Sequence, residues 1–180
     1  AHQVVYVKDD TSFNESFAAT VEEIGVQRWL RAHGDAQNDA QYVRAQRLRG
    51  VFRDLIRDAR VRLAAVYATD SPDAVKHEQK AAAFAAMREG YERAKAGEPG
   101  LAGYDRWFAG HLNAGPNNAS VASVALYTGQ VPAFKALFAD ADFDLPRFYR
   151  RVQVIGALGK SERDDLLARS AAHNAHVAGP

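Results

Sequence analysis

Apolar residues recur at three- and four-residue steps along most of the chain, which is the spacing of one face of an α-helix. The clearest stripe predicts one long helix, from about Ala36 to Tyr67. The whole pattern predicts an all-α fold, a helical bundle. The apolar members of the stripe are Leu48, Val51, Phe52, Leu55, Ile56, Ala59, Leu63 and Val66.

The segments on either side of this helix are also predicted to be helical. Before it, a helix capped by Ser12 or Asn14 is expected to end near His33-Gly34, and to carry Phe17, Val21, Ile24 and Trp29. Only Val4–Val7 has a β-like pattern, and residues 8–11 then turn the chain. After the long helix, Ser71-Pro72 is expected to cap a helix that reaches about Lys95 and packs antiparallel against 36–67. Its inward residues are predicted to be Val75, Phe84, Met87 and Tyr91.

A glycine-rich segment, Ala96–Pro116, interrupts the helical pattern around Tyr104, Trp107 and Phe108. We expect an ordered loop with one helical turn there. Four shorter helices are predicted to follow, at Asn118–Tyr127, Val131–Ala139, Asp144–Leu158 and Ser161–Ala172. No repeat or linker divides the chain, so a single domain over residues 1–180 is expected.

Composition excludes several classes of function. The net charge of +1 provides no general attraction for nucleic acid or membranes, and the absence of cysteine excludes disulfides and thiolate metal ligands. No apolar stretch approaches the length of a membrane span. Seven arginines fall between Arg44 and Arg62, where a nucleic-acid surface competes with a solvated helix face. No aromatic residues interleave with these arginines in the manner of a nucleic-acid site, which favours the solvated face.

The most informative residues lie near the start, where His2 is followed by Asn14-Glu15 and by Glu22. A neutral imidazole and a carboxylate suit Zn²⁺, and a twelve-residue loop can bring His2 back to a helix that begins near Glu15. Glu22 lies two helical turns after Glu15 on the same face, where it can orient a ligand histidine. Asn14 can cap the helix or bind a substrate backbone. A plain helix start beside a solvated terminal histidine explains the same residues, so both interpretations stay open.

The order of motifs resembles the bacterial putative zinc aminopeptidase family. Members of that family read His-Glu-Leu-Ala-His-Gln and then Asn-Glu-Ser-Phe-Ala, and this chain has Ala1-His2-Gln3 followed by Asn14–Ala18 and Val21-Glu22. More distantly the chain is similar to the gluzincin aminopeptidases. The same order continues through Leu63–Tyr67, Lys80–Tyr91, Tyr104, Trp107-Phe108, Asn117–Tyr127 and Val131–Phe134.

The resemblance implies zinc-dependent hydrolysis of N-terminal peptide bonds, with His2 and Glu15 as zinc ligands and Glu22 beside them. It implies that the first histidine and the general-base glutamate precede Ala1 in a longer protein, so that the 180 residues alone would be inactive. It also implies the C-terminal helical part of a gluzincin, a peptide substrate, and a bacterial periplasm or envelope. In thermolysin-type sites an aspartate follows the ligand glutamate by four residues, but Ala19 stands there in this chain.

Other polar residues are weaker candidates. A tetrahedral intermediate needs a hydrogen-bond donor, for which Tyr127 is the first candidate and Tyr104 the second, although both also suit a helical core. Asn117 and Asn118 are candidates for binding the substrate backbone, or they cap the helix that begins there. A metal-free helical binding or scaffold domain is the alternative function.

Overall fold

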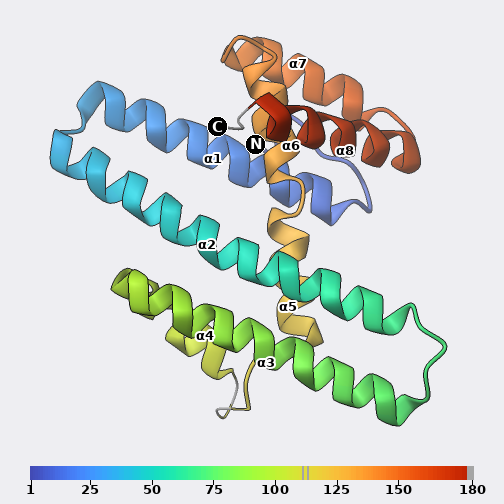
Figure 1. Ribbon diagram of the computed structural model, residues 1–180. Coiled ribbons are helices and arrows are strands. Elements are labelled where there is room, and N and C mark those ends of the chain that lie inside the picture. The colour runs from blue at the N-terminus through green and yellow to red at the C-terminus, as the bar shows by residue number, and fades with distance from the viewer. Residues whose placement is uncertain (111, 113, 178–180) are drawn as a thin grey trace. The chain divides into compact units, whose positions relative to one another are not determined.

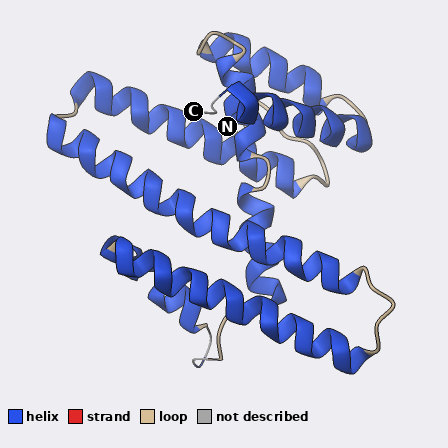
Figure 2. Cartoon of the chain, in the orientation of Figure 1, coloured by secondary structure: helices blue, strands red, loops and turns tan. Residues whose placement is uncertain are grey.

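The computed structural model describes residues 1–110, 112 and 114–177, and it confirms the all-α prediction. Within these ranges the chain consists of helices and connecting segments and contains no strand (Figure 2). The β-like run Val4–Val7 forms no strand and begins within a turn, in which the backbone N–H groups of Val4 and Val5 donate to the carbonyl of Ala1. In the same described ranges, no helix has both the length and the apolar character that crossing a bilayer requires.

Contacts between residues group into two compact units, Ala1–His33 with Leu126–Pro180, and Gly34–Ala125. One helix, α5 (Asn118–Thr128), includes residues of both. Two compact units can belong to one folding domain or to two, so the single domain expected from the sequence stays a prediction.

The first unit contains α1 (Thr11–His33), α6 (Val131–Ala139), α7 (Leu145–Gly156) and α8 (Lys160–Val177), labelled in Figure 1. Its core is built around aromatic rings. Phe134 of α6 lies between Phe13 and Phe17 of α1, with ring centroids 5.1 and 5.7 Å away, and Phe148 of α7 contacts Phe17 at 5.9 Å. All four rings are fully buried, so these four side chains join α1, α6 and α7 into one core.

The second unit contains α2 (Ala36–Tyr67), α3 (Asp73–Gly97), the 3₁₀ helix η1 (Pro99–Tyr104) and α4 (Asp105–Ala109). The α2–α3 antiparallel hairpin is confirmed, and Figure 1 shows the two helices side by side. The central members of the predicted stripe, Phe52, Ile56 and Leu63, are buried in one core cluster with residues of α3 such as Met87 and Tyr91, so the stripe faces α3.

Val75 was expected to face inward, but it is 38% exposed on α3. Trp29, one of the apolar residues of α1, is 59% exposed and stacks on His33. Ser71 was expected to cap α3, but the cap position belongs to Pro72, whose carbonyl accepts the N–H of Lys76.

The segment 96–116 contains more helix than the single turn that was expected, because η1 and α4 occupy much of it. Tyr91 of α3 holds these two short helices. Its hydroxyl oxygen lies 2.8 Å from the carbonyl oxygen of Leu101 and 2.6 Å from Oδ1 of Asp105, so these two acceptors share its one hydrogen. Its ring stacks on Phe108 with centroids 3.8 Å apart. Burial and the neighbouring Asp105 carboxylate raise the pKa of Tyr91, so the hydroxyl stays a donor.

We predict that Tyr91→Phe lowers the free energy of unfolding by about 1–3 kcal/mol, because the buried carbonyl of Leu101 loses its donor. The measurement is urea denaturation followed by circular dichroism. Tyr127→Phe is the control, since that side chain is 49% exposed and its change should stay within about 0.5 kcal/mol. Equal stabilities for the unaltered protein and Tyr91→Phe would contradict the proposed role of the hydroxyl.

Candidate functional site

Residues 1–10 fold back against the start of α1 and the end of α7, and we call them the returning segment. Val5 is buried in the same core as Phe13. Close approach is possible because α7 ends in a glycine: a Cβ built at Gly156 would lie 3.2 Å from Cγ2 of Val7 and 3.5 Å from Cγ1 of Val5. The lack of a side chain at this position therefore makes room for the returning segment.

Asp10 begins α1. Its Oδ1 accepts the backbone N–H of Phe13 at 3.1 Å, and its backbone carbonyl accepts the N–H of Asn14 at 3.1 Å. This is the hydrogen-bond pattern of a helix N-cap. The predicted caps, Ser12 and Asn14, are therefore wrong, and the helix begins at Thr11.

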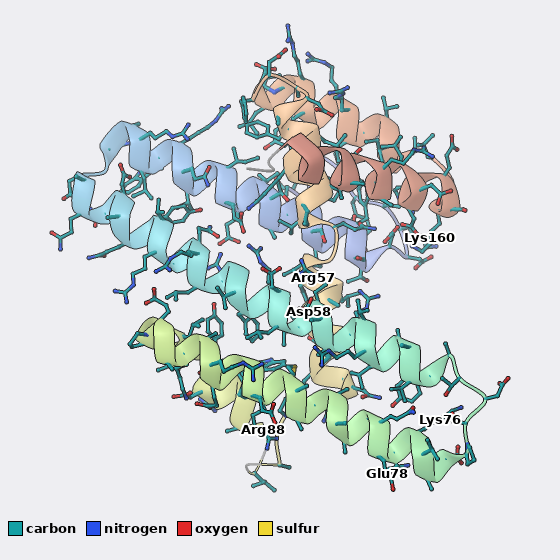
Figure 3. All side chains as sticks on the ribbon, viewed as in Figure 1. Arg57, Asp58, Lys76, Glu78, Arg88 and Lys160 are labelled. Atoms are coloured by element: carbon teal, nitrogen blue, oxygen red, sulfur yellow. The ribbon has the colours of Figure 1, made fainter. Side chains whose placement is uncertain are left out.

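The second carboxylate oxygen of Asp10 binds α8. Arg163 donates to Oδ2 of Asp10 from Nη2 at 2.6 Å and from Nε at 3.1 Å, and its Nη1 donates to the carbonyl of Leu158 at 2.7 Å. Both charged residues are only 4% exposed. Lys160, labelled in Figure 3, places its Nζ 3.6 Å from the same oxygen. Burial acts to raise the pKa of Asp10, but the hydrogen bonds from Arg163 and Phe13 and the two cationic charges outweigh it and hold that pKa below its usual value.

Asn14 ties the returning segment to α1. Its Oδ1 accepts the N–H of Val7 at 2.8 Å, and its Nδ2 donates to the carbonyl of the same residue at 2.7 Å. The side chain is 3% exposed. Its polar groups are thus used within the protein. The capping role belongs to Asp10, and substrate binding by Asn14 stays a prediction.

His2 lies beside the start of α1, where a reversal of the chain after His2 would place it. Its Nε2 is 3.2 Å from the backbone oxygen of Asn14, the residue before Glu15. The ring also meets Tyr6 edge-on, with centroids 6.3 Å apart. Within the described residues no hydrogen bond or ion pair joins His2 to the half-buried carboxylate of Glu15. The backbone therefore brings the two candidate ligands to neighbouring positions, and the pairing of their side chains stays a prediction.

Glu22 is exposed on α1, two turns after Glu15. Among the described residues, no hydrogen bond or ion pair joins it to His2, whose ring nitrogen instead faces the Asn14 carbonyl. In the part of the chain that the structure describes, no three His, Cys, Asp or Glu side chains gather closely enough to hold a metal ion. A catalytic zinc site has three protein ligands, so His2 and Glu15 alone do not complete such a set.

The other candidates have identifiable structural contacts. Asn117 caps α5, with Oδ1 accepting the N–H of Ser120 at 3.0 Å, and Asn118 donates from Nδ2 to the hydroxyl of Tyr67 at 2.8 Å. Tyr104 stacks on Phe52 with centroids 4.3 Å apart. Tyr127 is half exposed and belongs to the same compact unit as His2 and Glu15, whereas Asn117 and Tyr104 belong to the other unit.

Two polar interactions that organise this unit were not predicted from the sequence. One is the Asp10–Arg163 pair, and the other is an ion pair between the buried Glu23 of α1 and the partly exposed Lys135 of α6. Asp10 had a local signal, because an aspartate three residues before a buried phenylalanine is a common N-cap arrangement. In neither pair does the sequence around one charged residue indicate its partner, since more than a hundred residues separate the two members of each pair.

Fold and site together define an all-α protein in which His2 contacts the backbone of α1 at the residue before Glu15. A family model described as "Putative aminopeptidase" matches residues 1–167, and the chain belongs to that family. The match includes His2, Glu15 and Arg163. No curated protein and no solved structure matches the chain.

We predict that Asp10→Asn lowers the free energy of unfolding by about 3 kcal/mol or more at pH 7, because Arg163 stays buried without its counter-charge. The pKa of Asp10 is lower in the folded protein than in the unfolded chain. Its contribution to stability is therefore complete well above about pH 4 and is lost as the pH falls through the folded value. The difference between the two proteins should shrink on acidification, as measured by urea denaturation from pH 7 to pH 3.

Asp70→Asn is the matched control, because Asp70 is exposed between α2 and α3. Its stability should follow that of the unaltered protein within about 0.5 kcal/mol at each pH. A loss in Asp10→Asn that does not change with pH would show that the Asp10 charge is not what stabilises the helix start.

Proposed function

We propose that the protein is a zinc-dependent aminopeptidase and that this chain supplies His2 and Glu15 as two of its zinc ligands. Family membership over residues 1–167 supports the peptidase class. The observation that carries the metal proposal is the 3.2 Å contact between Nε2 of His2 and the backbone oxygen of Asn14. This contact brings an imidazole to the residue that precedes Glu15.

The donor set fits zinc. Histidine nitrogen and glutamate oxygen are both zinc ligands. When Nε2 of His2 carries the proton and donates to the Asn14 carbonyl, Nδ1 keeps the lone pair that a metal needs. Histidine ligands commonly have their second nitrogen held in this way by a backbone carbonyl. Glu15 lies half-buried in the first turns of α1, and no basic side chain forms an ion pair with its carboxylate in the described residues.

Each candidate has a role in the proposed reaction. When bound, zinc supplies a Lewis acid that polarises the scissile carbonyl and activates water. Glu22 would orient a ligand histidine, and the Tyr127 hydroxyl would donate a hydrogen bond to the oxygen on which charge develops. The remaining histidine and the general-base glutamate would come from a part of the natural polypeptide that precedes Ala1. Asn117 and Asn118 stay weaker candidates for substrate binding, because their side chains already have partners.

We predict that the natural full-length polypeptide contains one zinc ion per chain, and that Glu15→Gln loses most of it. The neutral amide is a much poorer zinc ligand than the carboxylate, so affinity should fall at least about tenfold. Zinc is measured by elemental analysis after dialysis against a weak chelator. Hydrolysis of aminoacyl amides should fall in the same variant.

Glu78→Gln is the control, because it makes the same chemical change on an exposed position of α3, labelled in Figure 3. Its zinc content should equal that of the unaltered protein. Absence of zinc from the unaltered polypeptide would refute the metal proposal and favour a metal-free helical binding or scaffold domain.

A further inference from the structure

Asn14 contacts the returning segment at two of its residues. Its side chain hydrogen-bonds the backbone of Val7, and its own backbone oxygen faces the ring of His2. Glu15 is the next residue of the helix. One residue is therefore bonded to the segment that carries one candidate ligand and is covalently joined to the other.

We propose that Asn14 is a positioning residue, which holds His2 in register with Glu15 so that both reach the same metal ion. This inference rests on the proposed function, and it assigns to Asn14 no contact with zinc or substrate. Twelve residues separate His2 from Glu15, a loop long enough to sample many arrangements unless it is fixed. Fixing it before the metal binds removes an ordering cost from binding.

The chemistry of the side chain explains why asparagine suits this position. A primary amide has an acceptor and a donor on one short side chain, so it can satisfy the N–H and the carbonyl of Val7 together. The distances of 2.8 and 2.7 Å show that both bonds are made. Aspartate lacks the donor, and alanine lacks both groups. Because Asn14 is 3% exposed, water cannot easily replace what is lost.

The other end of the segment is already held independently. Asp10 is fixed by the helix start and by Arg163. Loss of the Asn14 bonds should therefore free the part of the segment around Val7 without unfolding α1. The expected defect is local, in the placement of His2.

The test measures zinc affinity and amide exchange in the natural full-length polypeptide and in Asn14→Ala. Zinc affinity, from competition with a chelating dye, should fall roughly 10- to 100-fold, the range found when partners of metal ligands are removed. In the zinc-free protein, the Val7 amide should exchange its hydrogen faster, because its acceptor is gone. Neither reading depends on catalytic activity.

Thr20→Val is the matched control, because it also removes a buried side-chain hydrogen bond from α1. The Thr20 hydroxyl is fully buried and donates to the carbonyl of Ser16 at 2.8 Å, away from the returning segment. This variant should lose stability while its zinc affinity and Val7 exchange stay within about twofold of the unaltered protein. An equal loss of affinity in both variants would mean that general destabilisation weakens zinc binding, and the positioning role would be wrong.

The outcomes separate the two proposals. No zinc in the unaltered polypeptide overturns the proposed function, and the positioning role with it. Zinc bound equally well by the unaltered protein and by Asn14→Ala overturns the positioning role alone. If Asn14→Ala does not fold, Asn14→Asp replaces it. That variant keeps an acceptor for the Val7 N–H, and its added negative charge by itself attracts zinc, so weaker binding supports the role and unchanged or tighter binding overturns it.

Discussion

The carboxylate of Asp10 takes part in two structures, because Oδ1 caps the backbone of α1 and Oδ2 binds the guanidinium of Arg163 in α8. A buried charge is costly unless it is paired and fully hydrogen-bonded, and here Arg163 also has the Leu158 carbonyl as a partner. The position at which α1 begins is thereby coupled to the packing of α8. That position in turn determines where Asn14 and Glu15 lie and which residues remain to form the returning segment.

Helical periodicity predicted the elements of this protein well, because burial of one apolar stripe is a local property of the sequence. The helix Ala36–Tyr67 and the helix Val131–Ala139 have the predicted bounds. The residues at which helices begin were harder to predict from the sequence. Asp10 is preferred over Ser12 because Arg163 stabilises its charge, and a partner 153 residues away leaves no trace in the neighbouring sequence. Trp29 fits the apolar spacing of α1 yet is exposed, since periodicity indicates a face but not what covers its far end.

In the candidate site, too, local features could be predicted from the sequence, whereas features that depend on distant residues could not. The reversal of the chain between His2 and Glu15 followed from loop length and residue chemistry, and His2 does lie against the residue before Glu15. The use of Asn14 could not be predicted, because three roles compete for an asparagine near a helix start. It can cap the helix, bind a ligand, or replace a missing backbone partner for an extended segment. Only the position of Val7 distinguishes them, and that position depends on the core around Val5 and on the glycine at the end of α7.

The separation between Asp10 and Arg163 also affects how the protein is made. During synthesis the first helix leaves the ribosome long before its partner, and 153 residues take roughly 8 to 30 s to add at ordinary rates of translation. Through that interval Asp10 has no guanidinium to neutralise it, so the start of α1 and the segment that returns to it lack their main anchor. Synthesis of α8 therefore controls when residues 1–10 take their final positions. Such an order would delay the meeting of His2 with the start of α1 until nearly all of the described fold exists.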